Sequence, residues 1–112
     1  MGHEPKKHLF DIIQAGELIV QFTSGKTLEQ YRNDAQLRSA VERQFQIIGE
    51  ALQQLHRGFP DVAEKITYYR SIIDFRHILV HGYDRVEDDI VWGIIESRLP
   101  ALLSEAEMLL GK

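Results

Sequence analysis

Four side chains that can do chemistry lie close together in this sequence of 112 residues: Arg76, His77, His81 and Tyr83. The planar guanidinium of arginine can hold two phosphate oxygens at once through parallel hydrogen bonds. Histidine exchanges protons near neutral pH and is the side chain most often used as a general acid or base. An arginine followed closely by histidines therefore predicts binding of a phosphate group together with proton transfer.

The glycine after His81 allows a helix to end by entering the left-handed backbone conformation. At about 100° per residue, Arg76 and His81 diverge by about 140° on a straight helix, so one helix does not direct both at a single atom. Either the helix turns at Gly82 and swings His81 and Tyr83 around, or two copies of the chain meet across a two-fold axis and share a composite cleft. The residues alone leave both arrangements open.

Apolar residues recur at three- and four-residue steps along most of the chain, and this pattern predicts amphipathic helices. The helix that carries the motif has apolar residues on most of its sides, so it is expected to be buried or shared between two protein surfaces. With their capping residues, the predicted helices span about 5–22, 27–31, 34–58, a short piece up to 65, 67–82 and 89–110.

Helix starts are assigned to side chains that can accept a hydrogen bond from the first turn: Thr27, Asn33 or Asp34, and Thr67. Pro100 falls inside the last helix and must kink it or begin a new one, because proline removes a backbone hydrogen bond. Gly49 lies within the long central helix, where it costs about 1 kcal/mol relative to alanine. This cost predicts the close approach of a neighbouring helix, which could belong to a second subunit.

The chain shows no alternation typical of strands, no repeat and no low-complexity segment. Its length suits one domain, residues 1–112, and a hydrophobic content of 44% is enough for a core. The expected fold is an all-α, up-and-down bundle of four to five helices.

The composition excludes several classes of protein. There is no cysteine, so disulfide frameworks and thiolate metal sites are excluded. The polar first residues and the short apolar runs argue against a secretory signal and a membrane span, and a cytoplasmic protein is expected. Four basic and two acidic side chains between residues 65 and 85 give a local charge of +2 in a chain of net charge −4. That distribution suits contact with a few phosphates rather than with a long duplex.

The order Arg76, four residues, His81, one residue, Tyr83 resembles the signature of HepT-like toxins in the HEPN superfamily. The resemblance implies a small all-helical protein that acts as a homodimer and cleaves RNA without a metal or another cofactor. Flanking blocks extend the resemblance over nearly the whole chain: residues 40–43 and 47–51 of the central helix, and 91–92 and 99–103 of the last one.

On this resemblance, Arg76 would hold the phosphate, and His81 would be general base or acid while its symmetry mate takes the other role. His77 is similar to the polar residue that often follows the arginine and would support the site by orienting Arg76 or the phosphate. Tyr83 is similar to the tyrosine that a partner antitoxin, a minimal nucleotidyltransferase, modifies with AMP, which would block the phosphate site by charge and volume. RNA is the expected substrate, because a base can deprotonate its 2′-hydroxyl, which then attacks the neighbouring phosphorus. DNA lacks this hydroxyl and should resist cleavage.

The same residues also have simpler interpretations. Arg76 could pair with an acid such as Asp74 or Asp88, and Tyr83 could be a packing residue with a solvated hydroxyl. Charges of the central helix could form exposed salt bridges or could line a cleft opposite the motif; they are Glu42, Arg43 and Glu50. The histidines outside the motif have no obvious partners and are expected at the surface; they are His3, His8 and His56.

Two other functional classes stay open. His77 and His81 are four residues apart, so they could clasp a transition metal together with Asp74 or Asp84. Alternatively, the chain could be a non-catalytic nucleotide-binding or scaffold dimer that partners a nucleotidyltransferase. RNA cleavage that resists a chelator would dismiss the first class, whereas a dimer that binds AMP or ATP and never cuts RNA would favour the second.

Overall fold

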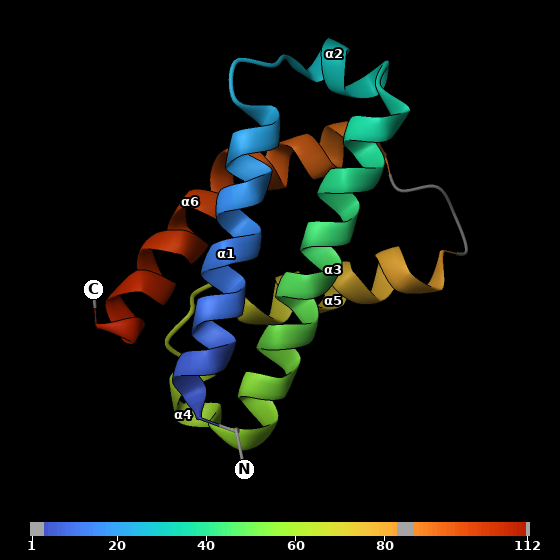
Figure 1. Ribbon diagram of the computed structural model, residues 1–112. Coiled ribbons are helices and arrows are strands. Elements are labelled where there is room, and N and C mark those ends of the chain that lie inside the picture. Colours follow the sequence, from blue (N-terminus) through green and yellow to red (C-terminus); the bar gives the residue numbers. More distant parts are fainter. Residues whose placement is uncertain (1–3, 83–86, 112) are drawn as a thin grey trace.

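The computed structural model describes residues 4–82 and 87–111. Within these residues the chain forms α-helices and no strand, which confirms the all-α class (Figure 1). Six helices are present there: four long ones, in agreement with the predicted bundle of four to five, and two short ones in the short pieces predicted at 27–31 and before 65. The helices are α1 (Pro5–Thr23), α2 (Leu28–Arg32), α3 (Ala35–Gly58), α4 (Pro60–Ala63), α5 (Tyr69–His81) and α6 (Asp88–Leu110).

Helices α1 and α3 lie side by side and run in opposite directions, while α5 lies across α3 (Figure 1). The up-and-down arrangement therefore describes α1 and α3, but the helix with the motif crosses the central helix instead of running along it. Helix α6 packs against α1 and α2. The core forms where these helices meet, and its largest fully buried side chains include Ile12, Ile19, Phe45, Leu52, Ile72, Leu99 and Leu102.

Two of the predicted caps are confirmed. The Thr27 hydroxyl accepts a hydrogen bond from the Gln30 backbone N–H at 3.1 Å, and the Gln30 side chain accepts one from the Thr27 N–H at 2.8 Å. Such reciprocal bonds satisfy two backbone donors that a helix start leaves free. Helix α3 is capped by Asp34, whose carboxylate accepts from the Leu37 N–H at 3.0 Å.

The third cap prediction is wrong, because Thr67 does not begin the motif helix. Helix α5 starts at Tyr69, and its N-cap residue, Tyr68, makes no side-chain capping bond. Thr67 instead donates its hydroxyl to the Glu105 carboxylate of α6, which also accepts from the Thr67 backbone N–H at 2.9 Å. A threonine hydroxyl can cap a helix or bond to a carboxylate. The fold decides between the two, because it brings Glu105 of α6 close to Thr67.

Pro100 lies inside α6, which continues through it as one helix. Figure 1 shows that α6 changes direction along its length. Because proline removes one hydrogen bond of the helix ladder, a bend is the expected consequence. Of the two predicted outcomes, the kink is therefore found and the new helix is not.

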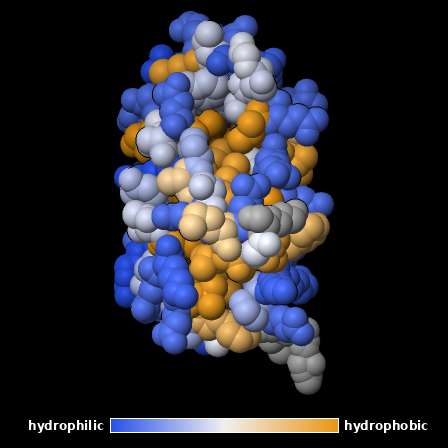
Figure 2. All heavy atoms as spheres, turned by 90° about the vertical axis from the view of Figure 1, so that its left-hand side faces the viewer, coloured by the Kyte–Doolittle hydropathy of each residue, from blue (hydrophilic) through white to orange (hydrophobic). Residues whose placement is uncertain are grey.

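Apolar surface is also present away from α5. Figure 2 shows the face on the left of Figure 1, where apolar side chains form a strip between polar ones. Large exposed apolar side chains of α1 and α6 include Phe10, Val20 and Met108. None of the helices in the described part of the chain combines the length and the apolarity needed to cross a bilayer.

Candidate functional site

The two halves of α5 differ in how deeply they are packed. Ile72 and Phe75 are buried, and the Phe75 ring meets the Phe45 ring of α3 edge to face with centroids 5.2 Å apart. Ile78 and Val80 in the second half are 54% and 45% exposed. Burial on most sides is therefore not found within one chain, and sharing of α5 with a second protein surface stays a prediction.

Gly49 permits the closest contact between α3 and α5. A Cβ atom built at this position would lie 2.1 Å from Cβ and 2.5 Å from Cγ of Arg76. Carbon atoms cannot approach so closely, so the Arg76 side chain crosses α3 where only a hydrogen fits. The glycine admits a neighbouring helix as predicted, and that helix belongs to the same chain.

The guanidinium of Arg76 is held by polar side chains of α3. Its Nη2 lies 2.8 Å from Oε1 of Glu50, and its Nη1 donates to Oε1 of Gln53 at 3.4 Å. Its Nε is buried and has no hydrogen-bond partner within the described residues. The predicted pairing of Arg76 with an acid is thus found, and the acid is Glu50 rather than Asp74 or Asp88.

Glu50 is itself oriented by a second contact. The Gln54 side chain donates to Oε2 of Glu50 at 2.8 Å, so the two carboxylate oxygens have different partners. The Arg76 side chain is 24% exposed, so solvent reaches part of it. A phosphate that approaches Arg76 must share it with Glu50 or displace that carboxylate.

Arg76 lies at the edge of a pocket of about 220 Å³ between α1 and α3. Among its charged lining residues, Arg43 and Arg76 are balanced by Asp11 and Glu50. The positive patch inferred from residues 65–85 is therefore offset by acids that other helices supply. Glu50 was expected to form an exposed salt bridge or to line a cleft, and it does both, because it pairs with Arg76 and lines this pocket together with Arg43. The other lining residues are Gln46, Ile47, Ala51 and Gln54.

His77 and His81 lie at the exposed surface of α5, with ring centroids 4.1 Å apart and ring planes at 55°. Helix α5 continues through His81, and Gly82 ends it in the left-handed conformation at φ 54° and ψ 31°. The turn at Gly82 thus begins after His81 and does not swing it towards Arg76, so the first of the two predicted arrangements is not found for His81. The ring contact also means that His77 can orient His81 directly, whereas Arg76 is held by α3.

Two residues of the predicted site cannot be compared with the structure. Tyr83, the predicted site of modification, and Asp84, a candidate metal ligand, lie outside the residues that the structure describes. In residues 4–82 and 87–111, no group of three His, Cys, Asp or Glu side chains is placed to hold a metal ion.

The histidines outside the motif do not all lie at the surface. His8 is only 7% exposed, so the surface prediction is wrong for it. His56 is partly buried, and its ring stacks on the Tyr69 ring with centroids 5.2 Å apart. This stack joins α3 to the first residue of α5, and it therefore helps to seat the helix with the motif. His3 lies outside the described residues.

The sequence did not single out Gln53 or Asp11, although both lie near Arg76. Gln53 is four residues beyond Gly49, so it shares the face of α3 that receives α5. That spacing is a signal from which Gln53 could have been found. No comparable signal exists for Asp11, because the packing of α1 on α3 decides which of its residues face the pocket.

The chain is similar to known proteins over most of its length. The model of the family described as "Ribonuclease HepT-like" matches residues 12–109. No solved structure matches the chain.

Three relatives illustrate the similarity. The "Probable ribonuclease HepT" of Thermococcus cleftensis is 31% identical, and the alignment covers 97% of this chain and 98% of the relative. A "Putative RNase" of Caldanaerobacter subterraneus is 30% identical over 96% of both chains. A "Putative RNase" of Methanocaldococcus jannaschii is 26% identical over 93% of this chain and 94% of the relative.

Proposed function

The chain belongs to the Ribonuclease HepT-like family, and from this premise we propose that it is a metal-independent endoribonuclease that works as a homodimer. The observation that carries the proposal is the different environment of two side chains of α5. Arg76 is fixed against Gly49 of α3, while His81 lies at the exposed end of the same helix. A fixed cation suits a phosphate, and an accessible imidazole suits proton transfer.

The proposed reaction uses the ribose as its own nucleophile. The imidazole of one His81 accepts the proton of the 2′-hydroxyl, and this oxygen bonds to phosphorus as the bond to the 5′-oxygen breaks. His81 of the partner subunit gives a proton to the leaving 5′-oxygen. The products are a 2′,3′-cyclic phosphate and a 5′-hydroxyl. Arg76 stabilises the negative charge on the phosphate oxygens during the step.

The homodimer is proposed because one chain does not bring its own Arg76 and His81 together. Positions five apart on a helix diverge by about 140°, and α5 is helical from Tyr69 through His81. Ile78 and Val80 are exposed beside His81. Their burial against a second copy would place two α5 ends next to each other, so that each cleft takes residues from both subunits.

Two further residues have positioning roles in the proposal. Glu50 holds the guanidinium of Arg76 and is itself held by Gln54. His77 contacts the His81 ring and limits its rotation. Neither residue needs to touch the reacting atoms, so their loss should reduce cleavage less than the loss of His81.

The test uses the purified protein with a single-stranded RNA and a DNA of the same sequence, both in the presence of EDTA. We expect the RNA alone to be cut, with 2′,3′-cyclic phosphate ends identified by mass spectrometry. His81→Ala should lower the rate by about 100-fold or more, the usual size of a general acid or base contribution. Gln36→Ala is the control, because Gln36 is an exposed residue of α3 outside the pocket at Arg76 and is expected to leave the rate unchanged.

Cleavage by His81→Ala at the wild-type rate would remove His81 from the mechanism. Loss of all cutting in EDTA, with recovery on addition of a divalent metal, would contradict the metal-independent reaction. A well-folded dimer that binds AMP and cuts no RNA would instead favour the non-catalytic alternative.

The proposal includes control by a partner. As a toxin of a toxin–antitoxin pair, the chain would be silenced when a minimal nucleotidyltransferase adds AMP to Tyr83, two residues after His81. The added phosphate would compete for Arg76 and fill the cleft. Co-expression with such an enzyme should raise the mass of the intact chain by one AMP and relieve growth arrest, and Tyr83→Phe should prevent both effects. An unmodified chain with undiminished toxicity would contradict this control.

A further inference from the structure

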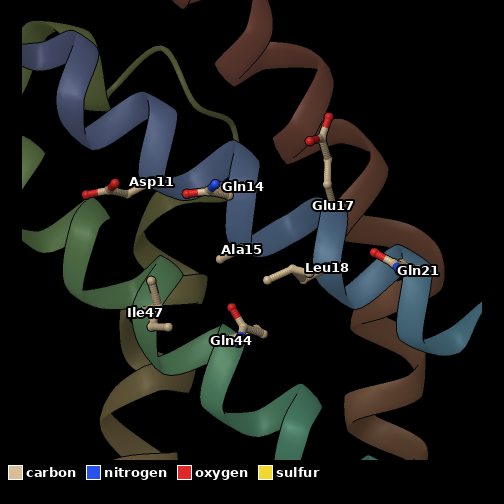
Figure 3. A pocket seen from close by; sticks show the side chains of 8 residues that line it. All are labelled: Asp11, Gln14, Ala15, Glu17, Leu18, Gln21, Gln44 and Ile47. Atoms are coloured by element: carbon tan, nitrogen blue, oxygen red, sulfur yellow. The ribbon is translucent and has the colours of Figure 1, made fainter.

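A second cavity continues the pocket at Arg76 along the groove between α1 and α3. Its volume is about 450 Å³, within the range of about 300–1,000 Å³ typical of small-ligand sites. Asp11 and Ile47 line both hollows, so the two are neighbouring parts of one groove. The side chains that line the larger cavity are drawn in Figure 3: Asp11, Gln14, Ala15, Glu17, Leu18, Gln21, Gln44 and Ile47.

The walls of this cavity combine an apolar surface with amide groups. Figure 3 shows Ala15 and Leu18 of α1 facing Ile47 of α3 across the space, with the Gln44 side chain beside them and Glu17 projecting away. An apolar surface suits the flat face of a nucleobase. A glutamine amide offers one acceptor and two donors, which is the pattern needed to bond to the edge of a base.

The charges along the groove give a bound nucleotide one orientation. The cations Arg43 and Arg76 line the smaller hollow, whereas no lysine or arginine lines the larger one. Asp11 and Glu17 add negative charge there, and Lys7 pairs with Asp11 at 3.1 Å from outside the cavity lining. The smaller hollow is balanced in charge and offers two guanidinium groups, whereas the lining of the larger one is net negative. A phosphate is therefore favoured at the Arg76 end over the glutamine end, where an uncharged base is accepted.

The two ends also lie at a suitable separation. Gln44 and Glu50 are six residues apart on α3, or about 9 Å at 1.5 Å per residue. Glu50 contacts the guanidinium of Arg76. A ribose and its base can bridge such a distance, so one nucleotide can place its phosphate at Arg76 and its base beside Gln44.

We propose that the cavity lined by Gln14, Gln21 and Gln44 holds an unpaired base next to the phosphate at Arg76 and favours bases that carry an exocyclic amino group. Carboxylate and amide oxygens accept hydrogen bonds from the amino groups of adenine, cytosine and guanine. Uracil has no amino group, and its one edge donor, N3–H, lies between two carbonyl oxygens that the carboxylates of Asp11 and Glu17 repel. This inference rests on the proposed ribonuclease function, because it supplies the base preference of the same site.

The first test is binding, which does not depend on cleavage. The side-chain amide signals of Gln44 are followed by ¹H–¹⁵N NMR and assigned by their absence in Gln44→Leu. Titration with AMP, CMP or GMP should shift these signals more than titration with UMP, and ribose 5-phosphate should leave them in place. Signals that stay in place with every nucleotide, or that move equally with ribose 5-phosphate, would overturn the base site.

The second test maps cleavage of a single-stranded RNA pool of random sequence. The wild-type protein should prefer amino-bearing bases over uracil at one position beside the cut by about tenfold, as expected for one good hydrogen-bonded base contact. Gln44→Leu should bring this ratio close to one. Gln36→Leu is the matched control, since Gln36 is an exposed residue of α3 outside both hollows, and it should keep the preference.

The outcomes separate this inference from the proposed function. Cleavage without base preference, together with unmoved Gln44 signals, would overturn the base site and leave the ribonuclease standing. Shifted Gln44 signals in a protein that cuts no RNA would support the base site and contradict the ribonuclease.

Discussion

The first half of α5 is packed more deeply than the second half. Ile72 and Phe75 are buried, and Arg76 is seated on Gly49 with its guanidinium bonded to Glu50. One turn further on, Ile78 is 54% exposed and His81 lies at the surface. A single helix thus carries one polar group fixed by its own chain and another left accessible to a partner.

This contrast shows why the motif alone does not make a site. The packing of α3 fixes the cation, so a single chain can offer a phosphate contact. The imidazole of His81 lies at the exposed end of the helix, and a helix that runs straight through both residues keeps them apart. Substitutions in the two halves of α5 should therefore impair the protein in different ways.

The largest effect is expected from Ile78→Asp in the exposed half. A charge at the proposed dimer seam should turn the dimer into a monomer and lower RNA cleavage by about 100-fold, as for loss of His81 itself. The free energy of unfolding of the monomer should change by less than about 0.5 kcal/mol, because the side chain is exposed. Analytical ultracentrifugation and a cleavage assay measure the two effects.

Met108→Asp is the matched control, because Met108 is 74% exposed on α6. It should stay dimeric and active. The reverse result, with Met108→Asp monomeric and Ile78→Asp dimeric, would move the interface from α5 to α6 and contradict the contrast between the two halves of α5.

A smaller effect is expected from Gly49→Ala in the packed half. The new methyl group would overlap Cβ of Arg76, and overpacking of this kind costs about 1–3 kcal/mol of the free energy of unfolding. Cleavage should fall because Arg76 is displaced, while the dimer persists. Chemical denaturation and the cleavage assay measure both quantities.

Gly93→Ala provides the comparison for that substitution. Gly93 lies within α6, and a Cβ atom there would meet nothing within 4 Å. Alanine should raise the free energy of unfolding by up to about 1 kcal/mol through helix propensity. An equal rise in the free energy of unfolding for Gly49→Ala and Gly93→Ala would show that the Arg76 side chain is not in close contact with Gly49.

The smallest effect is expected from Glu50→Gln, which keeps an acceptor for Arg76 and removes the negative charge. The Glu50 side chain is 44% exposed, so solvent screens the pair and its loss should cost less than about 1 kcal/mol of stability. RNA binding, measured in a His81→Ala background to prevent cutting, should tighten by about fivefold, because a charge that repels phosphate is gone. Weaker binding would mean that the role of Glu50 in holding Arg76 outweighs its repulsion of the phosphate.

Much of the fold was predictable because its signals are local. The helical periodicity, the caps at Thr27 and Asp34 and the place of Pro100 inside the last helix depend on residues within a few positions of each other. Thr67 shows the limit of such signals. Its partner, Glu105, is 38 residues away, and a competing contact at that distance cannot be foreseen from the residues beside it.

The sequence by itself determined the helices, the family and the order of arginine, histidine and tyrosine in the motif, since each depends on residue types at short spacing. Only the tertiary structure decided that Arg76 pairs with Glu50 and Gln53, that Gly49 faces α5, and that a glutamine-lined groove continues from the arginine. The physical reason is that these contacts depend on how α5 and α1 cross α3. That geometry is fixed by the packing of many buried side chains together and is not encoded at any one position.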